Sequence, residues 1–280
     1  MKTVKHFIEL TIPVTLIVVG MSSFAGGLMA AGSVSLNRNF IFSIAAFILI
    51  MAAFNTINGI FDIKLDKISK PHRPLPSSKI TRQHAWRFYV ALAVISSALA
   101  YAANTYVFIL VLGVIILSIL YSSPIMWLKR HLILNTTIVT ACYSVLPLLA
   151  GWVAFASPFS IPVSIFVILG LTSFGMVIVK DIEDMVADKV SGVMTIPIVL
   201  GLERTVYFLG ILFSFAYILI SYLALTKVLF LISLVGYLGM THLLFSIKKN
   251  PYPRLGKYFL LEAIFIGLTV EVLLAVVYIL

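Results

Sequence analysis

The sequence predicts an all-α integral membrane protein, a bundle of nine transmembrane helices in a single domain over residues 1–280. Two observations lead to this fold class. The chain is 61% hydrophobic and only 11% charged, with a mean hydropathy of +1.13, whereas soluble domains are about 45–50% apolar and about 25% charged. In addition, nine separate segments are apolar over a length close to the roughly 20 residues that cross a bilayer as a helix.

The expected spans follow from these apolar segments in chain order. The windows are 7–31, 40–61, 86–103, 106–123, 133–156, 160–179, 205–225, 228–246 and 258–279. Only Asn104 and Thr105 separate the third window from the fourth, so the two resemble one long helix. The first window is too long for the apolar core of a signal peptide, and no small-residue cleavage site leads from it into a soluble domain. We therefore expect it to remain as a span.

The distribution of charge predicts the orientation of the bundle. With nine spans, 18 of the 20 Lys and Arg residues fall in the connections on one side, and only Arg38 and Lys227 fall on the other. Because basic connections stay in the cytoplasm, the N-terminus and the longer, charged connections are predicted there. The net charge of +10 then reflects orientation in a lipid bilayer, and no nucleic-acid partner is expected. The single cysteine, Cys142, excludes an intrachain disulfide.

Two cytoplasmic connections, at about 58–85 and 180–204, hold most of the acidic residues. Six of the ten Asp and Glu residues are Asp62, Asp66, Asp181, Glu183, Asp184 and Asp188. Each connection places three oxygen ligands on one helical face, because residues three or four apart are neighbours on a helix. The two sets are Asn58, Asp62 and Asp66, and Asp181, Asp184 and Asp188.

This pattern predicts a cation site. Carboxylates at the membrane end of a helix are costly unless they are paired or bind a cation. One such set alone would be read as solvated loop residues or partners of nearby lysines, but two sets with matching spacing favour a shared site. Hard oxygen ligands suit Mg²⁺, which proteins hold through one or two carboxylates together with substrate phosphates. We expect Mg²⁺ bridged by a diphosphate, with Arg73 and Lys129 neutralising phosphate oxygens.

The acidic sets also indicate an internal duplication. Asp62 and Asp184 are 122 residues apart, as are Asp66 and Asp188, and each pair precedes a proline-containing stretch. Parallel repeats place equivalent loops on the same side of the membrane. The bundle is therefore expected to contain two four-helix pseudo-repeats plus a last helix.

Three stretches carry a family resemblance. Asn58 begins "NGIFDIKLDKISKPHRPLPSS", Asp181 begins "DIEDMVADKVSGVMTIPIVLG", and Tyr121 begins "YSSPIMWLKR". The first two resemble the NDxxDxxxD motif, commonly continued as NxPxRPLPSG, and the later DxxDxxxD motif of the UbiA superfamily of intramembrane prenyltransferases. The third resembles a further element of that family, a Tyr-Ser start with a later Lys. The resemblance covers nearly the whole chain in order and spacing.

The resemblance implies an enzyme that transfers a prenyl group from a prenyl diphosphate to a lipophilic acceptor, with Mg²⁺ as cofactor. It implies that the catalytic residues are Asp62, Asp66, Asp184 and Asp188. It implies that the metal ligands are these four together with Asn58 and Asp181. The residues implied in diphosphate binding are Asn58, Arg73, Tyr121, Lys129 and Lys180.

The acceptor is less well specified than the donor. By resemblance we expect a geranylgeranyl-type diphosphate and, as acceptor, geranylgeranylglyceryl phosphate in ether-lipid synthesis. An aromatic acceptor of quinone biosynthesis, of the 4-hydroxybenzoate type, is the alternative. The chain departs from the family pattern at Gly59 (first Asp), Ser69 (later Asn), Ser78 (final Gly) and Met176–Val177, where an Arg-Glu pair often stands. These departures leave the identity of the acceptor open.

A membrane transporter is the alternative from a different class, because repeats and membrane carboxylates occur in transporters too. Transporters place their sites near the bilayer midplane, in broken helices. Here the acidic sets lie at helix ends, and the middle of the spans is interpreted as uncharged. Glu262, in the last window, is expected to reach the interface. A non-catalytic scaffold would have no use for six clustered acids, so an enzyme is favoured.

Overall fold

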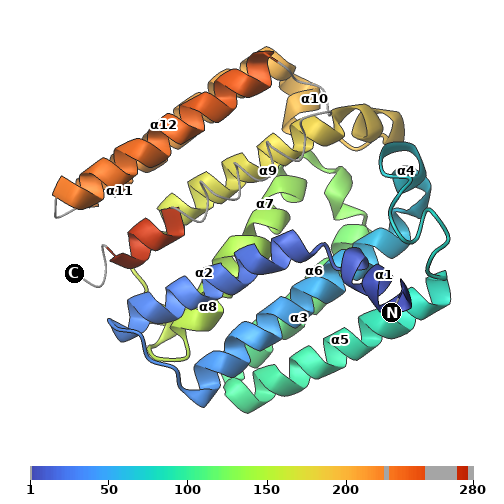
Figure 1. Cartoon of the computed structure of the whole chain (residues 1–280), viewed down its shortest axis with the longest axis horizontal. Helices are drawn as coiled ribbons and strands as arrows, with labels where there is room; N and C mark the ends of the chain where they lie inside the picture. The colour runs from blue at the N-terminus through green and yellow to red at the C-terminus, as the bar shows by residue number, and fades with distance from the viewer. Residues whose placement is uncertain (1, 224–226, 250–269, 277–280) are drawn as a thin grey trace.

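The computed structural model describes residues 2–223, 227–249 and 270–276, and within these ranges all regular structure is helical (Figure 1). Among these described residues, eight helices are long and apolar enough to cross a membrane. They are Pro13–Ala31, Arg38–Phe61, Arg82–Ala103, Thr105–Ser122, Leu132–Trp152, Val163–Val186, Leu202–Leu223 and Leu229–Lys249. These eight agree with the first eight predicted windows to within a few residues at most ends.

The elements follow one another in a simple order along the chain. The first half contains α1 (Lys2–Leu10), α2 (Pro13–Ala31), α3 (Arg38–Phe61), α4 (Ile63–Ser69), α5 (Arg82–Ala103) and α6 (Thr105–Ser122). The second half contains η1 (Leu128–Arg130), α7 (Leu132–Thr140), η2 (Ala141–Val145), α8 (Leu146–Trp152), η3 (Pro158–Ser160), α9 (Val163–Ser191), α10 (Ile196–Leu200), α11 (Leu202–Leu223) and α12 (Lys227–Lys249).

The first predicted window is two helices and not one. Helix α1 ends at Leu10, and α2 begins at Pro13. Proline disfavours helical geometry in the residue before it and is well placed at the first position of a new helix. Ile12, which precedes it, lies outside the right-handed helical region, with a positive φ of 52°. The break separates a short helix at the N-terminal end from the first span.

Two further local features follow from single residues. Asn104 separates α5 from α6, as predicted, because its side-chain oxygen accepts from the Val107 N–H at 2.9 Å and caps the second helix. In the fifth span, the five residues of η2 form a π-helical turn. Pro147 follows this turn and has no N–H to donate to the carbonyl four residues earlier, which accounts for the local irregularity.

The helices of the two acidic segments end at other residues than predicted. The chain does not place Asn58, Asp62 and Asp66 on one continuous helix, because α3 ends at Phe61 and Asp62 lies between α3 and α4. Hydrogen bonds from Asp62 N to Asn58 O (2.9 Å) and from Asp66 N to Asp62 O (2.8 Å) nevertheless keep the spacing of one turn. The second acidic set lies within α9, which continues to Ser191 and not to about residue 179 as expected.

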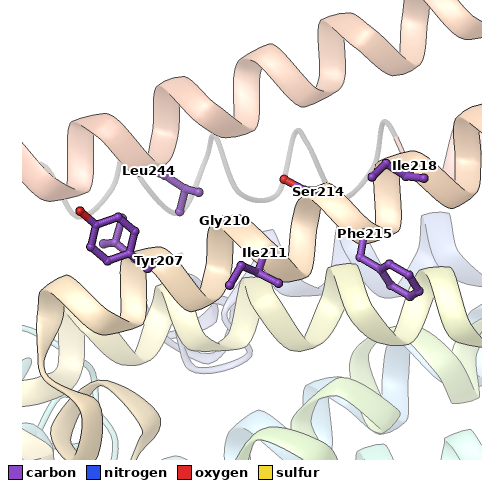
Figure 2. Close-up of a pocket in the computed structure, with 8 residues that line it drawn as sticks. Tyr207, Gly210, Ile211, Ser214, Phe215, Ile218 and Leu244 are labelled. Carbon is purple, nitrogen blue, oxygen red and sulfur yellow. The ribbon is translucent and has the colours of Figure 1, made fainter.

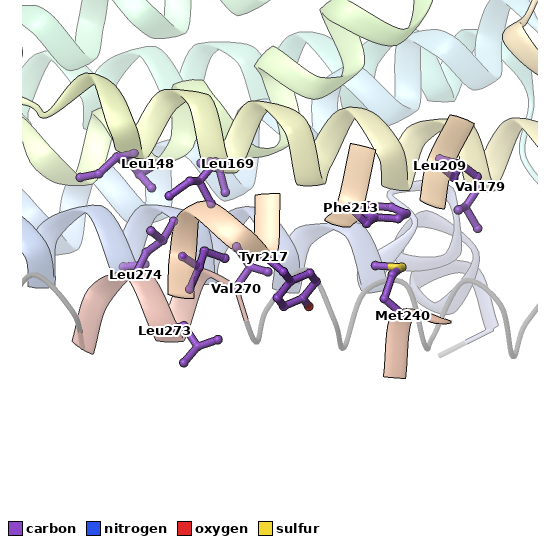
Figure 3. Packing of buried hydrophobic residues seen from close by; sticks show 14 of the residues in the cluster. Leu148, Leu169, Val179, Leu209, Phe213, Tyr217, Met240, Val270, Leu273 and Leu274 are labelled. Atoms are coloured by element: carbon purple, nitrogen blue, oxygen red, sulfur yellow. The ribbon is translucent and has the colours of Figure 1, made fainter. Parts of the chain in front are cut away.

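Close packing holds the two halves together. Helix α3 packs most extensively against α5, and α2 against α8. At the second contact a Cβ on Gly26 would lie 2.0 Å from the Leu148 carbonyl oxygen, and one on Gly151 would lie 1.7 Å from the Ser23 carbonyl oxygen. Only glycine allows backbones to approach this closely. The larger apolar cluster joins α2, α8, α9, α11, α12 and residues 270–276, as Figure 3 shows around Phe213 and Tyr217.

The last predicted window, 258–279, lies mostly outside the described residues, and so does Glu262. Within it, residues 270–276 are helical and bury Val270, Leu273 and Leu274 in the larger cluster. The nine-helix count and the pseudo-repeats therefore stay predictions.

Candidate active site

The first acidic set is matched by cations from outside its own helices. Lys129 of η1 donates a hydrogen bond to Asp62 Oδ1. Arg73 Nη1 lies 3.0 Å from one Asp66 oxygen and 3.3 Å from the other. Asp66 and Lys129 are buried, at 4% and 6% exposure. Each aspartate of this set therefore has one basic partner.

Asp62 has an unusual electrostatic environment for an ion-paired carboxylate. Burial raises the pKa of Asp62 above the ordinary value for aspartate, and the positive charge of Lys129 opposes that rise. Asp66 adds to the rise through repulsion. The ionised form of this carboxylate is stabilised by any further positive charge that binds beside it.

The proline-containing segment after α4 places Arg73 over the first set. Residues 70–81 contain no helix, as the prolines at 71, 74 and 76 predict. The segment is closed by hydrogen bonds from Arg73 N to Lys70 O at 3.0 Å and from Ser77 Oγ to Arg73 O at 2.6 Å. This path of the chain brings Arg73 into contact with Asp66.

The second acidic set is joined to the first by a lysine. Lys70, at the end of α4, lies 2.6 Å from Asp184 on α9. Lys180, one turn before Asp184 on the same helix, lies 3.4 Å from its other oxygen. Helix α4 packs against α9. The two motifs, more than one hundred residues apart in sequence, thus meet at one end of the bundle.

A chain of hydrogen bonds supports Asp181 from the interior. Tyr121 donates to Asn135 Oδ1 at 2.7 Å, and Asn135 Nδ2 donates to Asp181 at 3.3 Å. All three residues are buried. The ring of Phe54 lies 5.4 Å from that of Tyr121, centroid to centroid. Tyr121 is therefore positioned between α3 and α9, and its hydroxyl hydrogen is already used by Asn135.

Asp188 forms no ion pair within the part of the chain that the structure describes; Asp181 forms none there either, but it accepts a hydrogen bond from Asn135. Burial raises its pKa to about 6, and the charge of Asp184 adds to the rise, while Lys180 and Lys70 oppose it. The backbone beyond it turns back to η1, since Met194 N donates to Arg130 O at 3.2 Å. The second set therefore retains negative charge that no local cation neutralises.

Asn58 and Gly59 show how the first motif is built. Ser122 Oγ lies 3.5 Å from Asn58 Oδ1, so Asn58 faces α6. At Gly59, where the family pattern has Asp, a Cβ would lie 3.3 Å from Leu10 Cδ1 and 3.7 Å from Leu75 Cδ1. Side chains from α1 and the proline segment thus occupy the space beside Gly59, which leaves a carboxylate no room without their displacement.

The donor set fits a divalent cation that is shared with a ligand. Among the described residues no three His, Cys, Asp or Glu side chains lie close enough to hold a metal ion by themselves. The oxygens are the hard ligands that Mg²⁺ prefers, and Mg²⁺ commonly takes one or two carboxylates and fills its remaining positions with phosphate oxygens and water. The arrangement therefore fits Mg²⁺ together with a diphosphate, and it does not form a cage for the ion alone.

Some residues of this region were missed by the sequence analysis. Lys70 lies within the first quoted stretch, at a variable position of the family pattern, and was counted only as a topological charge. Asn135 lies outside all three stretches and was not considered. A second amide, Asn55, accepts from Tyr143 OH and donates to Thr11 O at 2.8 Å. Position 55 lies one turn before Asn58 in an apolar span, which is the signal that identifies a buried polar residue as structural or functional.

The middle of the spans is not free of ionisable residues, contrary to the interpretation from the sequence. Glu271 is buried, with 3% exposure, and accepts a hydrogen bond from Ser22 on α2. Ser22 is near the centre of its span. The other carboxylate oxygen of Glu271, Oε2, has no hydrogen-bond partner in the described structure. Glu271 lies beside the middle of α2, away from the two acidic sets. The site itself therefore remains at one end of the bundle.

The chain is similar to known proteins in both sequence and fold. The family model described as the UbiA prenyltransferase family matches residues 19–270. The digeranylgeranylglyceryl phosphate synthase of Thermococcus kodakarensis is 29% identical over 226 residues, which cover 78% of this chain and 77% of that protein.

Solved structures show the same architecture. A structure from work on digeranylgeranylglyceryl phosphate synthase in membranes has a TM-score of 0.71 at 25% identity and covers 100% of this chain and 99% of its own. A UbiA homolog from Archaeoglobus fulgidus, bound to GPP and Mg²⁺, has a TM-score of 0.72 at 22% identity, over 96% of this chain and 99% of its own. At the second identity the likeness concerns the fold alone.

Proposed function

The chain belongs to the UbiA prenyltransferase family, as a multi-pass membrane protein that transfers prenyl groups, and we propose that it uses a geranylgeranyl-type diphosphate to alkylate geranylgeranylglyceryl phosphate. The observation that carries the proposal is the meeting of both acidic sets around Lys70, Lys129 and Arg73. The name of the Thermococcus relative supports the acceptor. The ligands of the Archaeoglobus homolog support the donor class and the metal.

The diphosphate is proposed to lie between the two acidic sets. The residues that would hold Mg²⁺ are Asn58, Asp62, Asp66, Asp181, Asp184 and Asp188. When bound, the metal would supply positive charge to the leaving diphosphate. Three lysines are paired with carboxylates in this structure: Lys70, Lys129 and Lys180. Each could turn to a phosphate oxygen if its carboxylate were bound to metal instead. Arg73 offers several N–H donors to the same oxygens.

The reaction follows from this distribution of charge. The bond between the allylic carbon and the diphosphate oxygen breaks, and its electron pair leaves with the diphosphate. The acceptor hydroxyl oxygen forms an ether bond to that carbon and releases its proton to the departing diphosphate. Basic residues stabilise the departing charge more in the transition state than in the substrate, which is the condition for rate enhancement.

The apolar tail of the donor is proposed to extend into the bundle below the acidic sets. Phe54, Tyr121 and Tyr143 lie there, with ring centroids of Phe54 and Tyr143 6.0 Å apart. A buried chain gains about 0.8 kcal/mol for each CH₂ removed from water. This surface also excludes water, which would otherwise compete with the acceptor for the allylic carbon.

We propose that the acidic end faces the cytoplasm, as the positive charge predicts, with the ninth span completing the topology. Cysteines introduced at Lys79 and Val190 test this, because Val190 is 67% exposed beside the second set and Cys142 is buried. A membrane-impermeant thiol reagent applied outside intact cells should not label either one. Efficient labelling from outside contradicts the orientation.

The activity is tested with purified protein and geranylgeranyl diphosphate. Release of diphosphate and the product mass are measured with geranylgeranylglyceryl phosphate or 4-hydroxybenzoate as acceptor, with and without a chelator. We expect an ether product only with geranylgeranylglyceryl phosphate as the acceptor, and we expect its formation to require Mg²⁺. An aromatic product identifies the other acceptor class. Absence of turnover with every acceptor, in folded protein with Mg²⁺, contradicts the proposed activity.

A further inference from the structure

A groove of about 600 Å³ runs between α11 and α12 on the outside of the bundle. Figure 2 shows Gly210, Ile211, Phe215 and Ile218 of α11 along it, with Leu244 of α12 on the opposite wall. Ile211 and Ile218 are 72% and 63% exposed. Ser214, which also lines the groove, is hydrogen-bonded to Tyr237 at 3.1 Å. The groove thus presents hydrocarbon to the membrane, with its one central hydroxyl satisfied.

The absence of a side chain at Gly210 makes the groove deep at this point. A Cβ on Gly210 would have only Leu244 Cδ1 nearby, at 3.8 Å, which is an ordinary contact distance. The space is therefore not used for close helix packing. Tyr207 and Ile218 are eleven residues apart, or about 16 Å along a helix at 1.5 Å per residue. This length is about half of a hydrocarbon core of roughly 30 Å, so the groove matches one leaflet.

One end of the groove carries an exposed cation. Lys248 Nζ lies 3.5 Å from Tyr207 OH, 5.2 Å from the centre of its ring and 3.5 Å from the Glu203 carboxylate. Its side chain is 51% exposed, so it is open to a further partner. Lys249 follows Lys248 in the chain and Arg204 follows Glu203, both exposed, so these two helix ends carry three cations and one carboxylate. This end belongs to the face of the acidic sets, because α11 begins one residue beyond α10, which packs against α9.

We propose that the groove binds an anionic phospholipid of the surrounding bilayer, with its phosphate beside Lys248 and one acyl or prenyl chain along Gly210 and Ile211. The charge excess complements an anionic head, and the length complements one chain of the same leaflet. None of the residues that line the groove belongs to the acidic sets, so a lipid bound there need not reach them. The site is therefore separate from the proposed reaction.

Native mass spectrometry of the purified protein, titrated with phosphatidylglycerol or phosphatidylcholine, tests the proposal. We expect one phosphatidylglycerol to be retained tightly and phosphatidylcholine to bind at least about threefold more weakly. Gly210→Leu fills the groove and should weaken phosphatidylglycerol binding about tenfold or more. Gly113→Leu adds the same side chain to α6, where a Cβ meets no atom within 4 Å, and should leave binding unchanged.

A pair of charge variants tests the head of the site independently of the groove. Lys248→Gln should weaken phosphatidylglycerol binding about threefold, whereas Arg87→Gln, which removes an exposed cation from α5, should not. Equal retention of the two lipids, or equal binding by Gly210→Leu and Gly113→Leu, overturns the proposal. Displacement of the phospholipid by the acceptor, with a lower kcat/KM for Gly210→Leu, assigns the groove to substrate and overturns it as well.

Discussion

The two acidic sets have the same kind of ligands but a different balance of charge. In the first, Asp62 and Asp66 are each paired with one cation, Lys129 and Arg73. In the second, Asp184 takes two lysines, and Asp188 has no ion pair among the described residues. Asp181 is held by a neutral amide, Asn135. The first set is thus neutralised from within the protein, and the second is left with excess negative charge.

This difference in charge balance indicates where a cation and an anionic ligand are most favoured in the site. Five aspartates would repel one another strongly at one end of a bundle, and internal cations relieve part of that repulsion. A cation from solution gains most where internal ones are lacking, which is the second set. The cations of the first set are then free to interact with the phosphate oxygens. The predictions below test this division, in order of expected effect.

Removing the carboxylate that joins the two sets should have the largest effect. Asp184→Asn cannot neutralise Lys70 and Lys180 and offers a weaker ligand to a metal. We expect diphosphate release to fall about 1000-fold, comparable to the loss of a strong electrostatic contact in a transition state. Turnover is measured on detergent-solubilised protein whose Tm is within a few degrees of wild type. Near-normal turnover would remove Asp184 from the proposed machinery.

The buried pair of the first set should matter for stability. Lys129→Met leaves Asp62 buried without its cation, and breaking such a pair costs about 3–5 kcal/mol of unfolding free energy. The double variant Lys129→Met, Asp62→Asn removes both charges and should recover most of that stability but not the activity. Denaturation in detergent measures the first quantity, and diphosphate release the second. Recovery of activity by the double variant contradicts a role of these groups in the reaction.

Arg73→Lys tests whether a first-set cation contacts phosphate. A lysine preserves the positive charge but not the planar arrangement of donors, at a cost of about 1.5–3 kcal/mol for a charged hydrogen bond. We expect kcat/KM for the prenyl diphosphate to fall about ten- to a hundredfold. Lys64→Arg serves as the control on a neighbouring exposed cation. If Arg73→Lys has wild-type kinetics, Arg73 contributes only charge to the topology.

Asp188 tests the second set in the same way. Asp188→Asn should raise the Mg²⁺ concentration needed for half-maximal turnover about tenfold, in the range of lost metal-site interactions. Asp66→Asn, whose carboxylate is already paired with Arg73, should raise it less. The two variants are compared in one Mg²⁺ titration. A larger requirement for Asp66→Asn reverses the proposed division between the sets.

The sequence predicts the spans and the acidic sets well because both depend on local patterns. Hydropathy locates a helix without its neighbours, and the spacing of Asp181, Asp184 and Asp188 is sufficient to place them on one face of α9. The break between α3 and α4 at Asp62 was not predicted, since apolar character and charge do not show where a helix is interrupted.

Pairings across the bundle are not contained in local patterns. Lys70 meets Asp184 because α4 packs against α9, and Tyr121 meets Asn135 because α6 packs against α7. Glu271 could have been noticed as a carboxylate inside the last window, but its partner Ser22 is 249 residues away. Such contacts depend on the packing order of helices, which a single sequence does not state.

The smallest effect is expected at the link between the two sets. Tyr121 packs against Phe54 of α3 and donates to Asn135, which supports Asp181. Tyr121→Phe keeps the ring and leaves Asn135 Oδ1 without its donor, at a cost of about 1 kcal/mol for one neutral hydrogen bond. Because the ring stays, the tail surface is preserved and the change concerns only the support of Asp181. We expect kcat to fall about fivefold, with little change in KM for the diphosphate.

Tyr143→Phe is the matched control, since it also removes one hydroxyl, but one bonded to Asn55, whose other side-chain hydrogen bonds in the described structure go to Thr11 and Thr15. The two variants should lose similar stability, while Tyr121→Phe alone should lower kcat. If both lower kcat equally, the effect arises from packing around Phe54, which both rings contact. The hydrogen-bonded chain from Tyr121 to Asp181 would then have no specific part in coupling the two sets.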